Sequence, residues 1–116
     1  MHHTVPLTQN RDFQRLYARG KSCVSPSLVL YCCRNRSTGN RLGFTTGRKI
    51  GGAVQRNRAR RRLSEAFRLI EPETRTGYDI VVVARTRCLT QDFTYLRKEM
   101  HGLLRDLGLL QGGEPS

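Results

Sequence analysis

The middle of the sequence carries a dense run of basic residues whose type and spacing suit one kind of chemistry. The segment 47–69 reads GRKIGGAVQRNRARRRLSEAFRL, and five of its arginines fall within seven positions: Arg56, Arg58, Arg60, Arg61 and Arg62. A guanidinium group donates paired hydrogen bonds to phosphate oxygens and stacks on bases. Like charges this close repel one another, and a bound polyanion relieves that repulsion. A solvated charged face is the alternative, but only Glu65 offsets these arginines. The run therefore predicts a surface that binds nucleic acid.

Two further cations, Arg48 and Lys49, stand just before the glycine pair at residues 51–52. The pair is predicted to open a helix, and the free N–H groups at a helix start favour phosphate. The segment contains neither GxxxxGKS nor GxxxxGKT, so a P-loop is not predicted and nucleotide hydrolysis is not supported.

The whole chain is strongly basic, which limits the class of its partners. It has 116 residues, with 21 Lys or Arg against 9 Asp or Glu, and a net charge of +12. Residues 48–68 carry a net charge of +7, whereas residues 69–116 carry −1. A field of this size favours a polyanion. No apolar run approaches the ~20 residues of a membrane span, and no export signal is evident. We therefore expect a cytoplasmic protein that binds nucleic acid and no membrane.

No group of residues indicates that the chain cleaves RNA by itself. A protein nuclease needs clustered carboxylates for a metal ion, or a histidine base, and here the nine carboxylates are scattered along the chain. The four cysteines have neither CxxC spacing nor a grouped histidine, so we expect reduced thiols packed as small hydrophobic side chains: Cys23, Cys32, Cys33 and Cys88. We predict no catalytic residue and no tightly bound metal ion.

Hydrophobic periodicity predicts three helices. The first runs from a cap at Thr8 or Asn10 to about residue 19, where Gly20 ends it. The second spans about 51–70 before Pro72, and its apolar stripe is Ala59, Leu63, Ala66, Phe67 and Ile70. The third runs from 91 to 107 between a cap at Thr90 and a stop at Gly108, and its stripe is Leu96, Met100, Leu103, Leu104 and Leu107.

Two segments, 27–33 and 41–46, are predicted to be antiparallel strands, and 21–24 is a possible short edge strand. The apolar run 79–84 predicts a strand covered on both faces. We expect an α+β fold: a single two-layer domain, 1–116, of order α-β-β-(β)-α-β-α around a small mixed sheet. Flexible tails are expected at about 1–7 and 111–116.

Four blocks of the sequence together resemble the protein subunit of bacterial ribonuclease P. R-K-I-G-x-A-V-x-R-N-R-x-R-R, followed by E-A-F-R, is similar to the Arg-Asn-Arg signature of that family. The similarity extends to D-F-Q-R-L-Y-x-x-G, L-V-L-Y and G-Y-D-I-V-V-V-A-R, in the family's order and spacing. It covers roughly residues 7 to 108.

The resemblance implies a division of labour between protein and RNA. In that family the RNA subunit is the catalyst and uses Mg²⁺, while the protein binds the catalytic RNA and the 5′ leader of precursor tRNA. No protein partner is implied. The resemblance also implies the left-handed β-α-β crossover of the ribosomal S5 domain 2-like fold, against the general right-handed rule.

The family's binding residues carry over to two groups of positions. The positions matching those that bind the catalytic RNA are Arg48, Lys49, Arg56, Asn57, Arg58, Arg60 and Arg61. The positions matching the leader cleft are Phe13, Tyr17 and Tyr31. Aromatic rings beside cations suit unpaired nucleotides, although core packing is the alternative for each ring.

Three positions depart from the family pattern. Gly52 stands where Asn is usual, Ser64 where a basic residue is common, and Arg62 where an aliphatic residue is usual. The rival interpretation is a ribosomal or other structural RNA-binding protein. A transcription factor is not supported, because no helix-turn-helix spacing appears.

Overall fold

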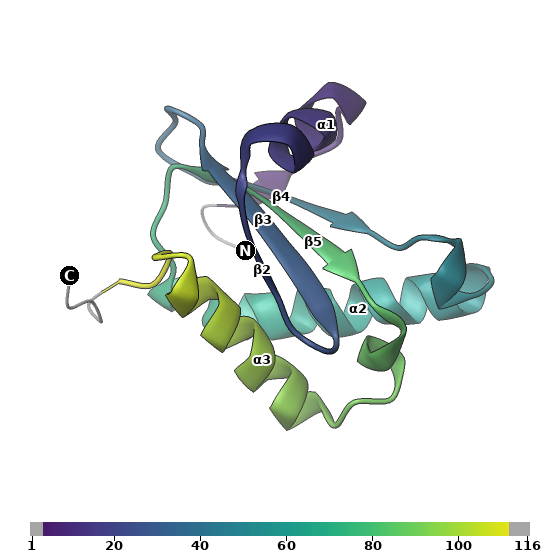
Figure 1. Cartoon of the computed structure of the whole chain (residues 1–116). Helices are drawn as coiled ribbons and strands as arrows, with labels where there is room; N and C mark the ends of the chain where they lie inside the picture. The colour runs from purple at the N-terminus through teal and green to yellow at the C-terminus, as the bar shows by residue number, and fades with distance from the viewer. Residues whose placement is uncertain (1–3, 112–116) are drawn as a thin grey trace.

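The computed structural model describes residues 4–111, which form three α-helices and one five-stranded mixed sheet (Figure 1). The elements, including three short 3-10 helices, are β1 (Thr4–Pro6), α1 (Asn10–Arg19), β2 (Lys21–Val24), β3 (Leu28–Arg34), β4 (Asn40–Thr45), η1 (Arg48–Ile50), α2 (Ala53–Ile70), η2 (Glu71–Glu73), β5 (Tyr78–Ala84), η3 (Thr86–Leu89) and α3 (Phe93–Asp106). The α+β class and every predicted helix and strand are confirmed, the edge strand β2 included, and β1 is an addition.

The sheet has the strand order β1-β4-β5-β3-β2, so the last strand in the chain occupies the centre. β5 pairs in parallel with β4 and antiparallel with β3. The apolar sequence of β5 explains its central position, because a strand that is apolar on both faces is stable only inside the sheet. The strands predicted at 27–33 and 41–46 do run in opposite directions, but they are not neighbours, since β5 lies between them.

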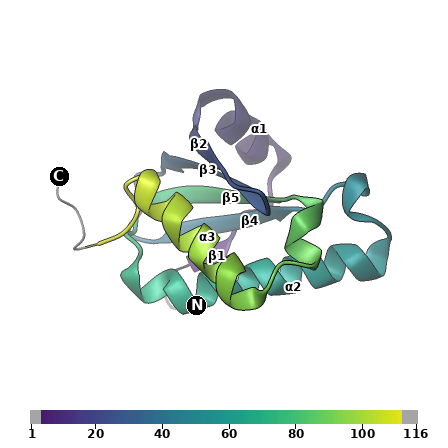
Figure 2. The same ribbon diagram turned by 60° about the horizontal axis from the view of Figure 1, so that its bottom comes forward.

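Helices cover both faces of the sheet, which corrects the predicted two-layer arrangement. Figures 1 and 2 show α2 and α3 together on one side and α1 alone on the other. The reason is that β3 and β5 carry apolar side chains on both faces. The α1 side buries a small cluster of Leu7, Leu16 and Val81. The domain therefore has a third, partial layer.

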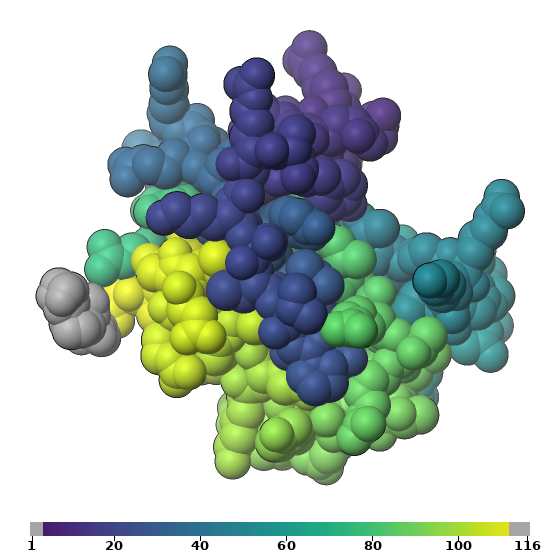
Figure 3. Space-filling model, viewed as in Figure 1, coloured from purple at the N-terminus to yellow at the C-terminus, as the bar shows by residue number. Residues whose placement is uncertain are grey.

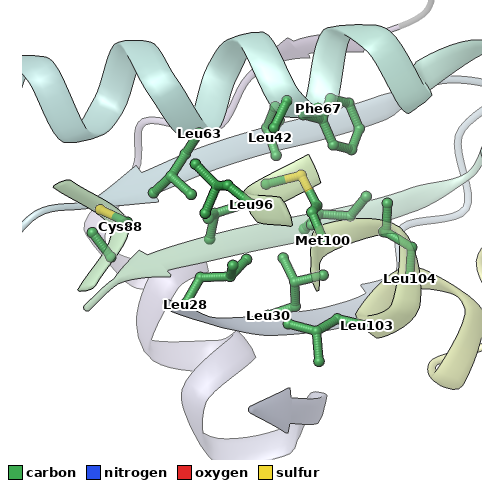
Figure 4. Packing of buried hydrophobic residues seen from close by; sticks show 14 of the residues in the cluster. Leu28, Leu30, Leu42, Leu63, Phe67, Cys88, Leu96, Met100, Leu103 and Leu104 are labelled. Carbon is green, nitrogen blue, oxygen red and sulfur yellow. The ribbon is translucent and has the colours of Figure 1, made fainter. Parts of the chain in front are cut away.

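The main core lies between the sheet and the helix pair α2 and α3 (Figure 4). The stripe predicted on α2 is fully confirmed, because each of its five residues is 2% exposed or less: Ala59, Leu63, Ala66, Phe67 and Ile70. On α3 four of the five predicted residues are buried, and Leu107 is half-buried against them. These two helices bury the larger part of the apolar side chains.

The helix ends differ from the prediction at their N-terminal caps. The N-cap of α1 is Gln9, which makes no side-chain cap hydrogen bond, so neither Thr8 nor Asn10 caps the helix. The N-cap of α3 is Asp92, whose carboxylate accepts from the Tyr95 N–H, whereas Thr90 ends the preceding turn. The charged carboxylate is the stronger acceptor for a free helix N–H. The predicted stops at Gly20 and Gly108 are confirmed.

Both ends of the described chain are held against the turn that follows α2. β1 pairs in parallel with β4, and the Thr4 hydroxyl donates to the buried Glu71 carboxylate. At the other end Gln111 donates through its backbone N–H to the Glu73 carbonyl at 2.7 Å and through its side chain to the Thr74 carbonyl at 2.7 Å. The expected tails at 1–7 and 111–116 are therefore too long, because 4–7 and 111 belong to the fold. The remainder, 1–3 and 112–116, lies outside the described residues.

Candidate nucleic-acid interface

The arginine-rich helix α2 presents most of its cations to solvent. Asn57, Arg58, Arg60 and Arg61 are exposed, and Arg56 is half-buried. Arg58 and Arg60 make only long hydrogen bonds, at 3.4 Å, to the Leu89 carbonyl and the Asn57 side chain. The one ion pair on α2 within residues 4–111 joins Arg68 to Glu65, at the far end from the arginine run. The charge of the run is therefore not balanced by neighbouring carboxylates.

The start of α2 adds two cations next to this run. Arg48 and Lys49 lie exposed on η1, and Gly52 is the N-cap of the helix. Gly51 has a φ of +130°, a conformation that side chains rarely adopt, and its carbonyl accepts from Arg56 at 2.8 Å. Gly52 has an ordinary φ of −76°, and a Cβ there would make only an ordinary contact with the Gln55 side chain at 3.6 Å, so backbone geometry does not require glycine at this position. The loop 47–52 and the first turn of α2 thus form one basic surface.

Arg62 has a structural role that separates it from its neighbours. Its side chain is half-buried and donates to the Cys88 carbonyl at 2.9 Å and to the Gln91 carbonyl. These bonds tie α2 to the turn between β5 and α3. These bonds explain why an arginine stands here in place of an aliphatic residue, because its guanidinium group satisfies one carbonyl within η3 and one that follows it. Ser64 is half-buried and adds no charge.

The three aromatic residues predicted for the leader cleft lie together between α1 and β3. The rings of Tyr17 and Tyr31 meet edge to face with centroids 5.0 Å apart, and those of Phe13 and Tyr17 lie 6.5 Å apart. Tyr17 is 37% exposed, whereas Phe13 and Tyr31 are half-buried. We call these three residues the aromatic cluster.

Phe13 packs against the sheet and is also partly exposed at the surface. A Cβ built on Gly43 of β4 would come within 2.6 Å of the Phe13 Cζ atom, so the ring lies directly on the sheet where no side chain intervenes. For each ring, packing in the core was the alternative to binding nucleotides. For Phe13, packing against the sheet is therefore a large part of its role. Tyr17 keeps its hydroxyl at the surface, where it shares a 2.8 Å hydrogen bond with Thr45.

A buried carboxylate fixes the helix that carries this cluster. Asp79 on β5 has a side chain with no exposure, and it accepts from Arg15 of α1 at 2.7 Å. It also accepts two hydrogen bonds from Arg41 of β4, at 2.8 and 2.7 Å, and one from Asn35 at 3.0 Å. Asp12 of α1 lies 3.3 Å from Arg15 and 3.4 Å from Arg41 and completes the network.

The hydrogen bonds keep Asp79 ionised despite its position. Burial alone would raise the pKa of the carboxyl, but the donors on Arg41, Asn35 and Arg15 outweigh it, and the pKa lies below its usual range. The hydrogen bond with Asp79 is also the main reason that the pKa values of Arg15 and Arg41 are raised. Sequence reasoning assigned no role to Asp79. The sequence did contain one signal for this role, because Asp79 is a single acidic residue at the start of the predicted strand 79–84, which is otherwise apolar.

The remaining chemistry of the described residues is limited. All four cysteines are free, and burial raises the pKa of the Cys32 thiol to about 11. Within residues 4–111 no group of three or more His, Cys, Asp or Glu is placed to hold a metal ion. In the same range, no helix combines the length and the apolar character that crossing a bilayer requires.

Comparison with known proteins identifies the family. Residues 1–108 match the family model described as Ribonuclease P. The chain belongs to the ribonuclease P protein family. The ribonuclease P protein component of Symbiobacterium thermophilum is 46% identical over 106 residues, which is 90% of this chain and 92% of that protein. The component from Thermoanaerobacter sp. (strain X514) is 38% identical over 110 residues, which is 95% of each chain.

Solved structures agree with this assignment. The RNase P protein of Staphylococcus aureus superposes with a TM-score of 0.81 at 28% identity and covers 91% of this chain and 97% of its own. The RNase P protein of Thermotoga maritima gives a TM-score of 0.79 at 31% identity and covers 87% of this chain and 96% of its own. As a ribonuclease P protein, the chain is an RNA-binding component of the endoribonuclease that acts in tRNA processing, and its partner is the ribonuclease P RNA. The rival assignment to another class of structural RNA-binding protein is thereby set aside.

The pH dependence of unfolding should report the Asp79 network. Because the folded-state pKa of Asp79 is lowered, its contribution is present above the unfolded pKa of about 3.9 and is lost as pH falls through the folded value. Asp79→Asn should reduce the free energy of unfolding at neutral pH by about 3 kcal/mol. This loss lies at the low end of the range for removing one partner of a buried ion pair. The reason is that Arg15 and Arg41 are about one-third exposed, so water can hydrate their charges when Asp79 is replaced. Chemical denaturation from pH 3 to 7 measures both quantities.

Asp106→Asn is the matched control, because its carboxylate lies 3.6 Å from Arg105 in an exposed pair. It should change stability little at any pH. Equal losses for the two variants would show that the network around Asp79 does not stabilise the fold.

Proposed function

We propose that this ribonuclease P protein binds the catalytic RNA through the cations of η1 and α2 and binds the 5′ leader of precursor tRNA through the aromatic cluster. The observation that carries the proposal is the hydrogen bond between Tyr17 and Thr45. Thr45 ends β4, and Arg48 follows three residues later. The bond therefore joins the aromatic cluster to the end of the strand that leads directly into the basic surface, so rings that suit bases lie next to the segment whose cations suit phosphates.

In the proposed mechanism this chain positions RNA and does no bond chemistry itself. The exposed guanidinium groups of Arg58, Arg60 and Arg61 neutralise phosphates of the catalytic RNA. Tyr17 and Tyr31 stack on unpaired bases of the leader. Activation of the attacking water would be left to Mg²⁺ held by the RNA subunit. The assembly acts in the cytoplasm, needs no further protein partner, and takes precursor tRNA as its substrate.

We further infer that the β4–α2–β5 connection has the left hand of the ribosomal S5 domain 2-like fold. In support, α2 joins two parallel neighbouring strands, and the two solved RNase P proteins superpose over nearly their whole length. An experimental structure of this chain would decide the hand.

Reconstitution tests the function as a whole. The purified chain, added to a ribonuclease P RNA from the same source at low Mg²⁺, should raise the rate of 5′ cleavage of precursor tRNA. The chain without RNA should cleave nothing, because its described residues hold no cluster for hydrolysis. Specific cleavage by RNA-free protein would contradict the proposed division of labour.

The salt dependence of RNA binding should report the arginine run. Each neutralised phosphate releases counterion, so Arg61→Ala should flatten the log–log slope of the association constant by about 0.7 to 0.9. Arg97→Ala removes an equal charge from the exposed face of α3 and serves as the control. Filter-binding titrations with the ribonuclease P RNA between 50 and 400 mM salt, roughly the range where the effect is large, give the slopes. An unchanged slope for Arg61→Ala would place this side chain in solvent within the complex.

The leader and the catalytic RNA should respond to different substitutions. Tyr31→Ala should weaken binding of precursor tRNA to the assembled enzyme by roughly 1–3 kcal/mol, the value of one base stack. Tyr31→Phe keeps the ring and should cost much less. Mature tRNA, which lacks the leader, should bind both enzymes equally. Paired titrations measure the difference, with thermal unfolding of each variant as the control. Equal weakening for both tRNAs would make Tyr31 a packing residue only.

A further inference from the structure

A cavity of about 370 Å³ opens at one end of the sheet, between the ends of α1 and α3. The strand register places its walls together, because Lys21 of β2 pairs with Cys32 of β3, and Arg34 of β3 pairs with Tyr78 of β5. The end of α1 and the end of α3 complete it. Its full lining is Arg19, Lys21, Cys32, Cys33, Arg34, Tyr78 and Leu107.

The cavity gathers positive charge with no acidic residue in its lining. Arg19, Lys21 and Arg34 come from three different elements, and none of them takes part in the ion pairs found within residues 4–111. Three cations converging on one hollow repel one another, and the fold alone gives them no counter-charge. An anion in the cavity would supply it.

The rest of the lining is apolar and partly aromatic. The Arg34 guanidinium lies over the Tyr78 ring, with its central carbon 5.7 Å from the ring centroid. At this distance the ring attracts the cation and keeps it near the cavity, where a base can also contact it. Leu107 and Cys32 form an apolar wall beside it. Cations next to an apolar wall match a nucleotide, which combines a phosphate with a flat, weakly polar base.

The cavity borders the aromatic cluster through Cys33, but most of its wall lies on the other face of the sheet. Side chains alternate across a strand, so Cys32 points into the core beneath α3 while Tyr31 points toward α1. Lys21 shares the face of Cys32 through their register. In Figure 3 the dark blue segment that contains β2 lies beside the yellow end of α3, away from the teal start of α2. The cavity therefore adds a third basic site at the opposite end of the sheet from η3.

We propose that this cavity binds one nucleotide unit of RNA, with its phosphate on Arg19, Lys21 and Arg34 and its base against Arg34 and Leu107. This proposal rests on the proposed function for the identity of the partner, which is RNA. The net charge of +12 favours this polyanion over an acidic peptide, since the arginine-rich helix already suits the same ligand.

A chemical-shift titration of the full chain with a 5′-phosphorylated uridine trinucleotide tests the site. Saturable shifts are expected at the amides of Gly20, Lys21, Arg34 and Tyr78. The double variant Lys21→Ala/Arg34→Ala should lose these shifts, while Arg97→Ala/Lys98→Ala, which removes the same charge from exposed positions on α3, should keep them. Both variants should unfold at nearly the wild-type temperature, because all four side chains are exposed.

The outcomes separate this site from the proposed function. Shifts confined to α2 and the aromatic cluster would overturn the cavity assignment and leave the proposed function intact. No shift anywhere on the chain would count against both. Inorganic phosphate binding in the cavity as tightly as the trinucleotide would overturn the nucleotide assignment. In the assembled enzyme, Lys21→Ala/Arg34→Ala should weaken RNA binding by at least about tenfold relative to its control, because the loss of even one charge-assisted contact has an effect of that size.

Discussion

The arrangement of this protein depends on one carboxylate that has no contact with water. Asp79 is the second residue of the central strand, and its oxygens receive hydrogen bonds from a helix, a neighbouring strand and the loop between β3 and β4. A buried charge is costly unless each of its acceptor sites is occupied, so these donors are constrained to fixed positions. The constraint matters most for α1, which buries only Leu16 completely. Apolar contact alone leaves the direction of such a helix loosely determined, and the link from Arg15 to Asp79 fixes it. The position of the aromatic rings on the sheet thus depends on the ion pairs that the same helix makes with β4 and β5.

The arginine run illustrates how one composition signal covers two physical roles. Arg62 and Arg56 turn inward and satisfy backbone carbonyls of the chain itself, at Cys88 and Gly51. Their neighbours at 58, 60 and 61 point outward and have few partners. A helix carrying so much like charge would be poorly held if all its arginines faced solvent. The inward pair instead anchors α2 to the loops at both of its sides, so the outward cations project from a rigid element.

Sequence patterns predicted the helices of this fold better than its strand order. The apolar stripe from Ala59 to Ile70 has only one face that can be buried, so periodicity determines both the helix and its orientation. Strand order depends instead on which neighbours cover Val81 and Val82, and this is decided by long-range packing that no local pattern contains. The short strand β1 was missed because three residues with a proline carry no periodic signal. The basic surface was predicted from the charge and spacing of the arginine run, and the family resemblance assigned the individual basic and aromatic positions. Nothing local distinguished Arg62 from the arginines beside it, and Asp79 acquires its role only when Arg15 and Arg41 are brought to it.

The meeting of both chain ends on the turn at 71–74 has a consequence for the connectivity of the molecule. Thr4 and Gln111 bind the same few residues, so the ends of the described chain lie a short distance apart. Proteins with adjacent termini tolerate circular permutation. Joining the ends and reopening the chain in the polar loop between β3 and β4 would preserve every strand pairing while making β4 the first element synthesised. The three-dimensional arrangement of this fold is thus separable from the order in which the ribosome produces it.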